Sequence, residues 1–297
     1  MTSRRDVLDI AEATRLLLLA LDFDAIDSLL LVLHQDPSGN ALLTDAQLWT
    51  ELIVLHFGAR LPEDLAFLAV PLKERAWHWQ DPERTCVELR EFLRSGDERE
   101  HFRRTVHVLS RNIGLIEHIN ETPLDGLAFS TNVYLSNHFI GAAGAIFNRA
   151  GRELNEYVSR PEFHFRRNVG EAVATPAFDA GVRRLIHCVG PRISHNNCYQ
   201  LLANTYENVM NVIIAEELKC VAIASFSTGS MGVPAKGAAK YGLRALQKVI
   251  RSQHWEGLLA IVCVEDKILK AFQEQLDEVL RTFNVVPPFT QVSMDGM

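Results

Sequence analysis

The segment 226–234 is rich in glycine and hydroxyl residues, a composition that suits the binding of an anion. Two glycines and two hydroxyls lie near its centre, and Pro234 follows them at the start of a predicted helix. Glycine lets backbone N–H groups approach an anion closely, and a helix N-terminus adds a favourable partial charge. The segment therefore has the chemistry of a phosphate-binding loop, although a strand-to-helix turn without a ligand would use the same residues. The residues of this loop are Ser227, Thr228, Gly229, Ser230, Met231 and Gly232.

Strands and helices alternate around this loop. Strand-like runs lie near 105–109, 125–132, 171–178, 184–189, 220–226 and 258–264. Helical spacing covers 144–158, 199–218, 234–250 and 267–283. This order predicts an α/β fold with a mostly parallel or mixed sheet that helices cover on both faces. Ligands of such sheets bind beyond the C-terminal ends of the strands, where the 226–234 loop and another loop within 129–146 both lie.

The first hundred residues have a different pattern, which predicts an all-helical domain. The spacing is helical from residue 6 to about residue 94, and a polar run at 95–101 precedes the first strand. A capping segment at 44–47 opens a helix that Gly58 ends, and Pro62 opens a shorter one. We therefore expect a helical N-terminal domain at 1–100, an α/β domain at 101–283 and a C-terminal tail at 284–297.

Charge and cysteine content restrict the partners and the compartment. The net charge is −7, and residues 1–100 carry 10 Lys and Arg against 19 Asp and Glu, whereas residues 101–297 carry 20 against 18. An acidic front half repels phosphates, so we expect no nucleic-acid partner. The apolar run at 16–21 is too short to span a bilayer, so we expect no membrane partner and a cytoplasmic or nuclear location. The five cysteines are scattered without metal-ligand spacing, which predicts reduced thiols and no metal site.

Five stretches of the α/β part resemble motifs of macrodomains. They are LAFSTN, GAIFNRAG, GEAVATPAF with RRLIHCVGP, LLANTYENVM and STGSMGVPAKGAA, in family order over residues 101–283. The resemblance implies a three-layer αβα domain that binds ADP-ribose in a cleft without a cofactor. In that family the histidine of the IHxVGP segment, here His187, belongs to a strand, so we expect it to be structural.

The resemblance also implies which residues contact the ligand. The 226–234 loop would wrap the diphosphate, and the helix near Gly144 would present its N-terminus from the other side. Asn132 would bond a hydroxyl of the distal ribose, and the amide oxygen of Asn112 would accept from the adenine amino group. The remaining implied contacts are Ile113, Gly141, Ala143, Ala145 and Ile146.

This sequence departs from the family pattern at several of those positions. The first phosphate loop reads His138-Phe139-Ile140-Gly141, where macrodomains have a run of glycines. Ala143 stands where hydrolytic members carry an Asp that helps to activate water, and Met231 replaces an aromatic residue beside the distal ribose. These departures predict a binding module for ADP-ribose or ADP-ribosylated protein that lacks efficient hydrolysis.

Two other functions remain open at this point. The first is an enzyme that removes ADP-ribose or deacetylates O-acetyl-ADP-ribose, with a ligand phosphate as the base. The second is a degenerate macro scaffold that binds no nucleotide and serves protein interaction. In every case the helical N-terminal domain could bind a protein partner of its own.

Overall fold

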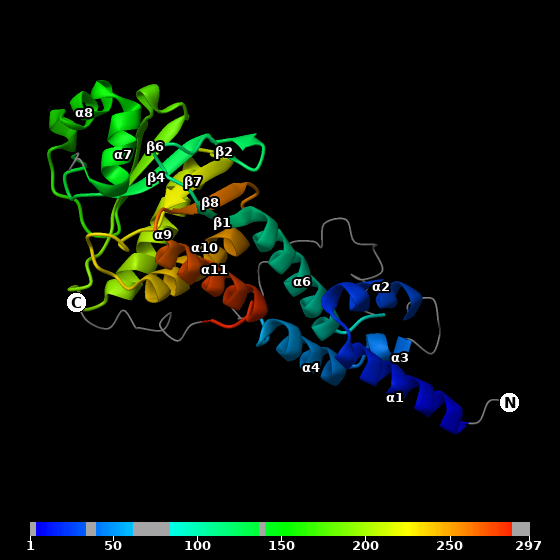
Figure 1. Cartoon of the computed structure of the whole chain (residues 1–297). Coiled ribbons are helices and arrows are strands. Elements are labelled where there is room, and N and C mark those ends of the chain that lie inside the picture. The colour runs from blue at the N-terminus through cyan, green and yellow to red at the C-terminus, as the bar shows by residue number, and fades with distance from the viewer. Residues whose placement is uncertain (1–3, 34–39, 62–83, 137–139, 287–297) are drawn as a thin grey trace. The chain divides into compact units, whose positions relative to one another are not determined.

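The computed structural model describes residues 4–33, 40–61, 84–136 and 140–286 (Figure 1). These residues form two compact units, one with residues 4–101 and 280–286 and the other with residues 102–279. Within the described ranges, every helix is too short or too polar to cross a lipid bilayer. The unit of residues 102–279 carries the candidate site.

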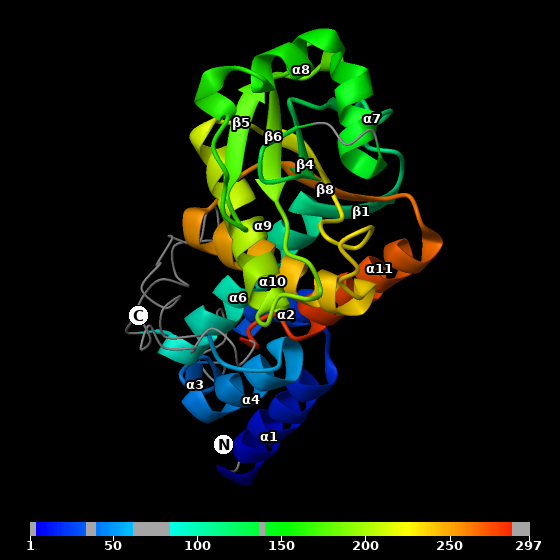
Figure 2. The same ribbon diagram turned by 90° about the vertical axis from the view of Figure 1, so that its left-hand side faces the viewer.

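A six-stranded mixed sheet forms the centre of that unit (Figures 1 and 2). Its strands are β1 (Val106–Ser110), β4 (Gly126–Thr131), β5 (Ala172–Pro176), β6 (Arg184–Val189), β7 (Cys220–Ala224) and β8 (Leu258–Cys263). The order is β1-β8-β7-β4-β6-β5, and only β5 runs antiparallel to its neighbour. β7 is buried along its whole length, as expected of a strand covered on both faces. The C-terminal ends of the five parallel strands therefore lie at one edge of the sheet.

Helices flank the sheet on either side (Figure 2). They are α7 (Gly141–Ala150), α8 (Arg152–Val158), α9 (Cys198–Ala215), α10 (Ala235–Gln253) and α11 (Asp266–Arg281). Phe147 of α7 packs edge-on against Phe129 of β4, with ring centroids 6.2 Å apart. α9 packs closely against α10 because Gly242 has no Cβ, which would lie 2.6 Å from the Tyr206 ring. The α/β fold predicted from the sequence is confirmed.

The structure differs from the predicted elements at two places near β4. The predicted helix 144–158 is two helices, α7 and α8, because Gly151 between them has a φ of 79°. α7 also begins earlier than expected, at Gly141, after an extended Ile140. A short hairpin, β2 (His118–Ile119) with β3 (Thr122–Pro123), precedes β4. Strands of two residues are too short to show alternation, so the sequence does not predict this hairpin.

The other unit is helical, as expected, and packs around aromatic side chains. Its helices are α1 (Arg4–Ala20), α2 (Phe23–Leu33), α3 (Asn40–Leu43), α4 (Ala46–Phe57) and α6 (Val87–Thr105), whose residues from Phe102 onward belong to the unit with the sheet. The Phe92 ring lies 5.3 Å from the rings of both Phe23 and Trp49, and 5.5 Å from that of Phe57. α4 begins and ends where the sequence predicts, with Asp45 as its N-cap and Gly58 in the left-handed region at its C-cap.

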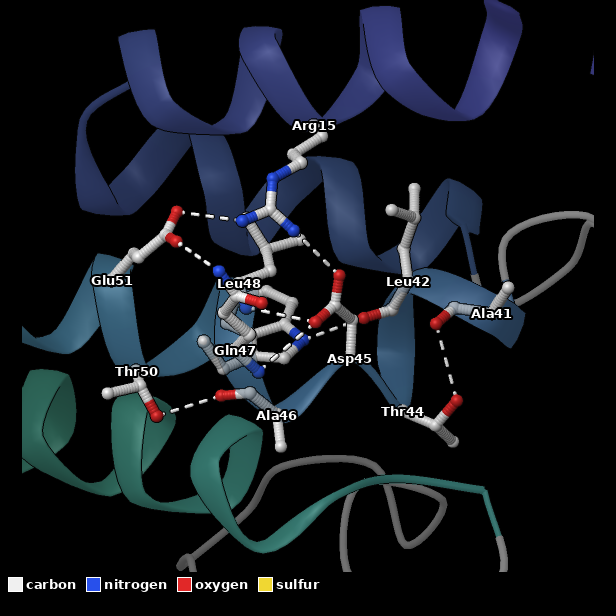
Figure 3. A network of polar contacts seen from close by, with 11 residues as sticks. Arg15, Ala41, Leu42, Thr44, Asp45, Ala46, Gln47, Leu48, Thr50 and Glu51 are labelled. Atoms are coloured by element: carbon white, nitrogen blue, oxygen red, sulfur yellow. Dashed lines mark hydrogen bonds and ion pairs between the residues drawn. The ribbon is translucent and has the colours of Figure 1, made fainter. Parts of the chain in front are cut away.

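Arg15 of α1 is the centre of the polar network in Figure 3. Its two terminal nitrogens donate to Asp45 Oδ2 and Glu51 Oε2, each at 2.8 Å. The other carboxylate oxygen of Asp45 accepts from the N–H groups of Gln47 and Leu48, at 3.1 and 3.0 Å. Asp45 therefore caps α4 and holds α1 against it at the same time.

The polar run at 95–101, where the helical pattern was expected to have ended, lies inside α6 instead. Gly96 faces the core, and a Cβ there would lie 1.9 Å from the Phe23 ring. The Arg99 guanidinium lies over the Phe23 and Phe57 rings, 5.4 and 4.8 Å from their centroids. The helix continues because even this polar stretch presents one face to aromatic neighbours.

The residues just after α11 group with the helical unit. Asn284 is buried, its N–H donates to Phe57 O at 3.0 Å, and its side chain donates to Ser95 Oγ at 2.9 Å. The expected tail at 284–297 thus begins with packed residues. The domain boundaries at 100 and 283 stay predictions, and the short helix expected after Pro62 falls outside the described residues.

Candidate functional site

A cleft of about 890 Å³ opens at the C-terminal edge of the sheet. Residues that follow β1, β8, β7, β4 and β6 form its walls, together with the first turn of α7 and Ile268 of α11. This is where ligands bind in open α/β sheets, because the loops that leave parallel strands converge there. The cleft is lined by Asn112, Ile113, Ser130, Thr131, Asn132, Ile140, Gly141, Ala142, Ala143, Ala145, Arg192, Ala224, Ser225, Ser227, Thr228, Gly229, Ser230, Met231, Val262, Val264, Glu265 and Ile268.

Most of the predicted contact residues are brought together in this cleft. Gly144, Ile146 and Gly232 are the exceptions, since none of them forms part of its wall. Gly144 and Ile146 are buried within α7, because the helix turns their positions towards the protein interior. Within the described residues, no three His, Cys, Asp or Glu side chains cluster as metal ligands.

The loop after β7 presents a row of backbone donors. The N–H groups of residues 227–231 have no acceptor among the residues that the structure describes. The loop is closed on itself by hydrogen bonds from Val233 N–H to Ser227 O, at 3.0 Å, and from Gly232 N–H to Gly229 O, at 2.9 Å. Thr228 Oγ1 donates back to Ser225 O at 2.9 Å. Consecutive free N–H groups held in a rigid loop form a concavity that suits an anion.

Tyr206 of α9 fixes the start of this loop. Its hydroxyl oxygen accepts from Phe226 N–H at 3.2 Å, and the two rings lie 4.6 Å apart. Burial raises the pKa of Tyr206, so its hydroxyl stays neutral and keeps its hydrogen-bonding role. Tyr206, which lies in the family-like stretch LLANTYENVM, thus positions the candidate anion-binding loop at 227–232, called the anion loop below.

Ser227 lies in a strained and crowded place at the base of the loop. Its φ is 62°, in the left-handed region that non-glycine residues seldom adopt. Its hydroxyl is buried and has no partner among the described residues. A Cβ on Gly190, which follows β6, would lie 2.5 Å from Ser227 Oγ and 3.2 Å from Ser130 Oγ. Gly190 thus leaves room for the hydroxyls of Ser227 and Ser130, which both line the cleft.

The loop after β4 is organised by Asn132. Its Oδ1 accepts from the N–H groups of Tyr134 and Ser136, at 2.8 and 3.1 Å, and its Nδ2 donates to Ser136 Oγ at 2.6 Å. The side chain expected to bond a ribose therefore also shapes its own loop. Of the altered first phosphate loop, His138 and Phe139 lie outside the described residues, whereas Ile140 and Gly141 line the cleft.

The opposite end of the cleft, after β1 and β8, is mainly apolar. It is lined by Ile113, Val264 and Ile268. Apolar side chains of this kind can pack against a flat aromatic ring. The Oδ1 of Asn112 accepts from Gly114 N–H at 2.9 Å. The amide oxygen expected to accept from adenine thus already has one donor, which leaves it a single further lone pair.

Groups that could activate water are scarce in the cleft. Ala143 is 7% exposed and offers only a methyl group. Among the described residues that line the cleft, Glu265 alone carries a carboxylate, and it follows β8. β7 lies between β8 and β4, so this carboxylate is separated from the Asn132 end of the cleft. A general base beside Asn132 is therefore not present among the described lining residues.

His187 lies in β6 and is fully buried. Its ring lies 4.7 Å from that of Phe129, and its Nε2 is 3.1 Å from Thr175 Oγ1. Burial lowers the pKa of His187 to about 3. An imidazole that stays neutral near neutral pH, packed beside aromatic rings, fits the structural role expected from the sequence.

Comparison with known proteins agrees with this geometry. The Macro domain family model matches residues 130–241. A macro domain-containing protein of Lactiplantibacillus plantarum is 34% identical over 139 residues, which cover 46% of this chain and 79% of that protein. The chain belongs to the macrodomain family.

Other macrodomain proteins extend the comparison. An O-acetyl-ADP-ribose deacetylase of Citrobacter rodentium is 30% identical over 46% of this chain and 80% of its own length. The solved Oceanobacillus iheyensis macrodomain with ADP has a TM-score of 0.53 at 24% identity, over 58% of this chain and 90% of that one. The Trypanosoma brucei macrodomain in complex with ADP-ribose has a TM-score of 0.50 at 19% identity, over 58% and 68%. These structures share the macrodomain fold.

Sequence reasoning missed several lining residues. Ser130, Arg192 and Ser225 lie at strand ends that are far apart in the sequence, and only the strand order brings them to one cleft. The VGP motif before Arg192 resembles the family pattern, but a motif match does not show that the next residue faces the cleft.

Proposed function

We propose that this macrodomain binds ADP-ribose or a close derivative in the cleft, free or attached to protein, and hydrolyses it poorly. The observation that carries the proposal is the row of N–H groups at 227–231 without acceptors among the described residues. Such a row suits the two phosphates of a nucleotide diphosphate. The volume of about 890 Å³ suits a ligand of that size. A relative of 30% identity named for an ADP-ribose derivative supports the same ligand class.

Poor hydrolysis follows from the side chains around the expected distal ribose. Ala143 cannot accept a proton, and Met231 is a flexible chain where a rigid ring would orient the sugar. Asn132 can bond a hydroxyl, but an amide is no base at neutral pH. The protein would therefore act as a module that recognises ADP-ribose.

Deacetylation of O-acetyl-ADP-ribose is the second candidate, because relatives carry that name. A phosphate oxygen of the bound ligand would have to serve as the base. Incubating the full chain with O-acetyl-ADP-ribose and measuring free acetate tests it. Acetate release that Gly229→Glu abolishes would favour the enzyme over the binding module.

Titration calorimetry of ADP-ribose into the full chain tests the main proposal. We expect micromolar or weaker affinity, because the first phosphate loop lacks most of the family's glycines. Gly229→Glu should abolish binding through steric block and charge repulsion. A Cβ at Gly229 meets no atom within 4 Å, so the substitution should leave the fold intact.

Gly229→Ala is the matched control, since it adds a Cβ without the carboxylate. Its affinity should stay close to that of the natural chain. Absence of binding by the natural chain itself would favour the degenerate scaffold. Equal binding by Gly229→Glu would place the ligand elsewhere.

A further inference from the structure

Arg192 is a cationic side chain in the wall of the cleft. It follows β6 directly, after Gly190 and Pro191, and it is the only Lys or Arg among the described residues that line the cleft. The side chain is exposed and forms no hydrogen bond or ion pair with any residue that the structure describes. A guanidinium left without a carboxylate beside a row of N–H donors suits an anionic ligand.

The backbone around Arg192 is fixed against the anion loop. Its N–H donates to Nδ1 of His195 at 3.2 Å, which closes a turn. The next N–H, of Ile193, donates to Met231 O at 3.0 Å. A Cβ on Gly232 would lie 3.4 Å from Ile193 Cγ2, which is ordinary contact. The Cα of Arg192 is therefore held beside the loop at 227–232, and only its side chain remains to be ordered by a ligand.

Strand order places the two charged lining residues on opposite sides of the loop. Arg192 follows β6 and Glu265 follows β8, with β4 and β7 between them. The segment bonded directly to the anion loop is the one that carries Arg192. Positive charge is thus built on the β6 side of the cleft, and negative charge on the β8 side.

The altered loop after β4 gives this positive charge a role. Ile140 there is extended and exposed, and its Cβ and side chain occupy a place where a glycine would leave the backbone open. The Ile140 side chain therefore restricts the approach of a diphosphate to the backbone beside it. The planar guanidinium of arginine can donate hydrogen bonds to two phosphate oxygens at once.

We propose that Arg192 binds the diphosphate of the ligand from the β6 side of the cleft, beside the N–H groups of residues 227–231. This inference rests on the proposed function, because it assigns a further contact to the same cleft. It also defines the ligand as an anion, so that an uncharged nucleoside gains nothing from Arg192.

Calorimetry of the full chain with Arg192→Gln and Arg192→Lys tests the proposal against three ligands: ADP-ribose, ADP and adenosine. Arg192→Gln should weaken ADP-ribose and ADP alike, by roughly tenfold to a hundredfold. Arg192→Lys should restore part of the lost affinity, since lysine keeps the positive charge but lacks the bidentate guanidinium. The matched control is Arg152→Gln on α8, which removes the same charge from a residue 90% exposed outside the cleft.

Each outcome has one meaning. Equal binding of ADP-ribose by Arg192→Gln and the natural chain overturns the inference and leaves the proposed function intact. A loss for ADP-ribose but not for ADP also overturns it, because Arg192 would then contact the ribose. An equal loss with adenosine overturns it as well, since it would indicate a change in the protein. Failure of the natural chain to bind ADP-ribose or ADP refutes the proposed function itself.

Discussion

Gly190 and Ser227 belong to different strand ends, yet a single added methyl group would bring them into collision. A Cβ on Gly190 would lie 2.5 Å from Ser227 Oγ, a distance that side chains do not tolerate. Ser227 is itself strained, with a φ of 62°. A side chain at position 190 would therefore force Ser227, in the anion loop, to shift.

Gly190→Ala should lower both stability and ligand affinity. Overpacking of this kind costs about 1–3 kcal/mol, and the shifted loop should bind ADP-ribose at least roughly tenfold more weakly. Urea denaturation and calorimetry measure the two effects. In the double variant Gly190→Ala with Ser227→Gly, the colliding hydroxyl is absent and stability should largely return. A double variant as unstable as Gly190→Ala alone would place the strain elsewhere.

Ala143→Asp should increase the release of ADP-ribose from mono-ADP-ribosylated protein. The new carboxylate would stand in the cleft wall and could accept a proton from water, an effect commonly worth factors of about 10² to 10⁴ in rate. Release of labelled ADP-ribose measures it. Ala143→Asn is the isosteric control without a base, and it should stay inactive. Efficient release by the natural chain would contradict the binding-module proposal.

His187 should make stability fall in acid. Its pKa is lowered to about 3 in the folded protein, so below about pH 6.5 the unfolded chain takes up a proton that the folded chain refuses. Above pH 6.5 His187 is neutral in both states and does not lower the free energy of unfolding. As the pH falls from about 6.5 towards 3, the free energy of unfolding declines by up to about 1.4 kcal/mol per pH unit.

Urea denaturation between pH 4 and 8 should reveal this slope, and the His187→Phe variant should show a shallower one. Phenylalanine suits the site because the neighbouring rings belong to Phe129 and Phe147. An unchanged slope in the variant would assign the acid sensitivity to other groups, such as His56, whose pKa burial also lowers.

Gly96→Ala should destabilise the helical unit although alanine favours helices by about 1 kcal/mol over glycine. The added Cβ would lie 1.9 Å from the Phe23 ring, so the ring must move. Overpacking costs about 1–3 kcal/mol, which exceeds the helical gain. Urea denaturation followed by circular dichroism measures the difference. Phe23→Leu combined with Gly96→Ala should cost less than the sum of the two single changes, and strict additivity would rule out the collision.

The sequence predicted elements whose cause is local. β6 was predicted at its observed bounds, and α4 was predicted from its cap at Asp45 to its stop at Gly58. The loop after β7 could be singled out as a candidate because glycines and hydroxyls adjacent in the chain form it. The broken helix at Gly151 was missed, because an isolated glycine within a helical pattern does not show whether the chain turns there.

The rest of the site depends on contacts that local patterns do not contain. Arg192 and Ser130 reach the cleft because β6 and β4 are neighbours in a strand order that the sequence did not predict. The polar stretch in α6 looked like a domain boundary because its hydrophobic neighbours, such as Phe23, come from another helix. For the same reason, the domain limits at 100 and 283 and the ligand contacts stay predictions.

The donors of the loop after β7 belong to the main chain, and this has a consequence for mutational screens. Replacing Thr228 or Ser230 by alanine would leave every N–H group of residues 227–231 in place. A conventional alanine scan would therefore report the loop as unimportant even if it held the ligand. Substitutions that alter the path of the backbone, or esters that replace single amides, are the changes to which this site would respond.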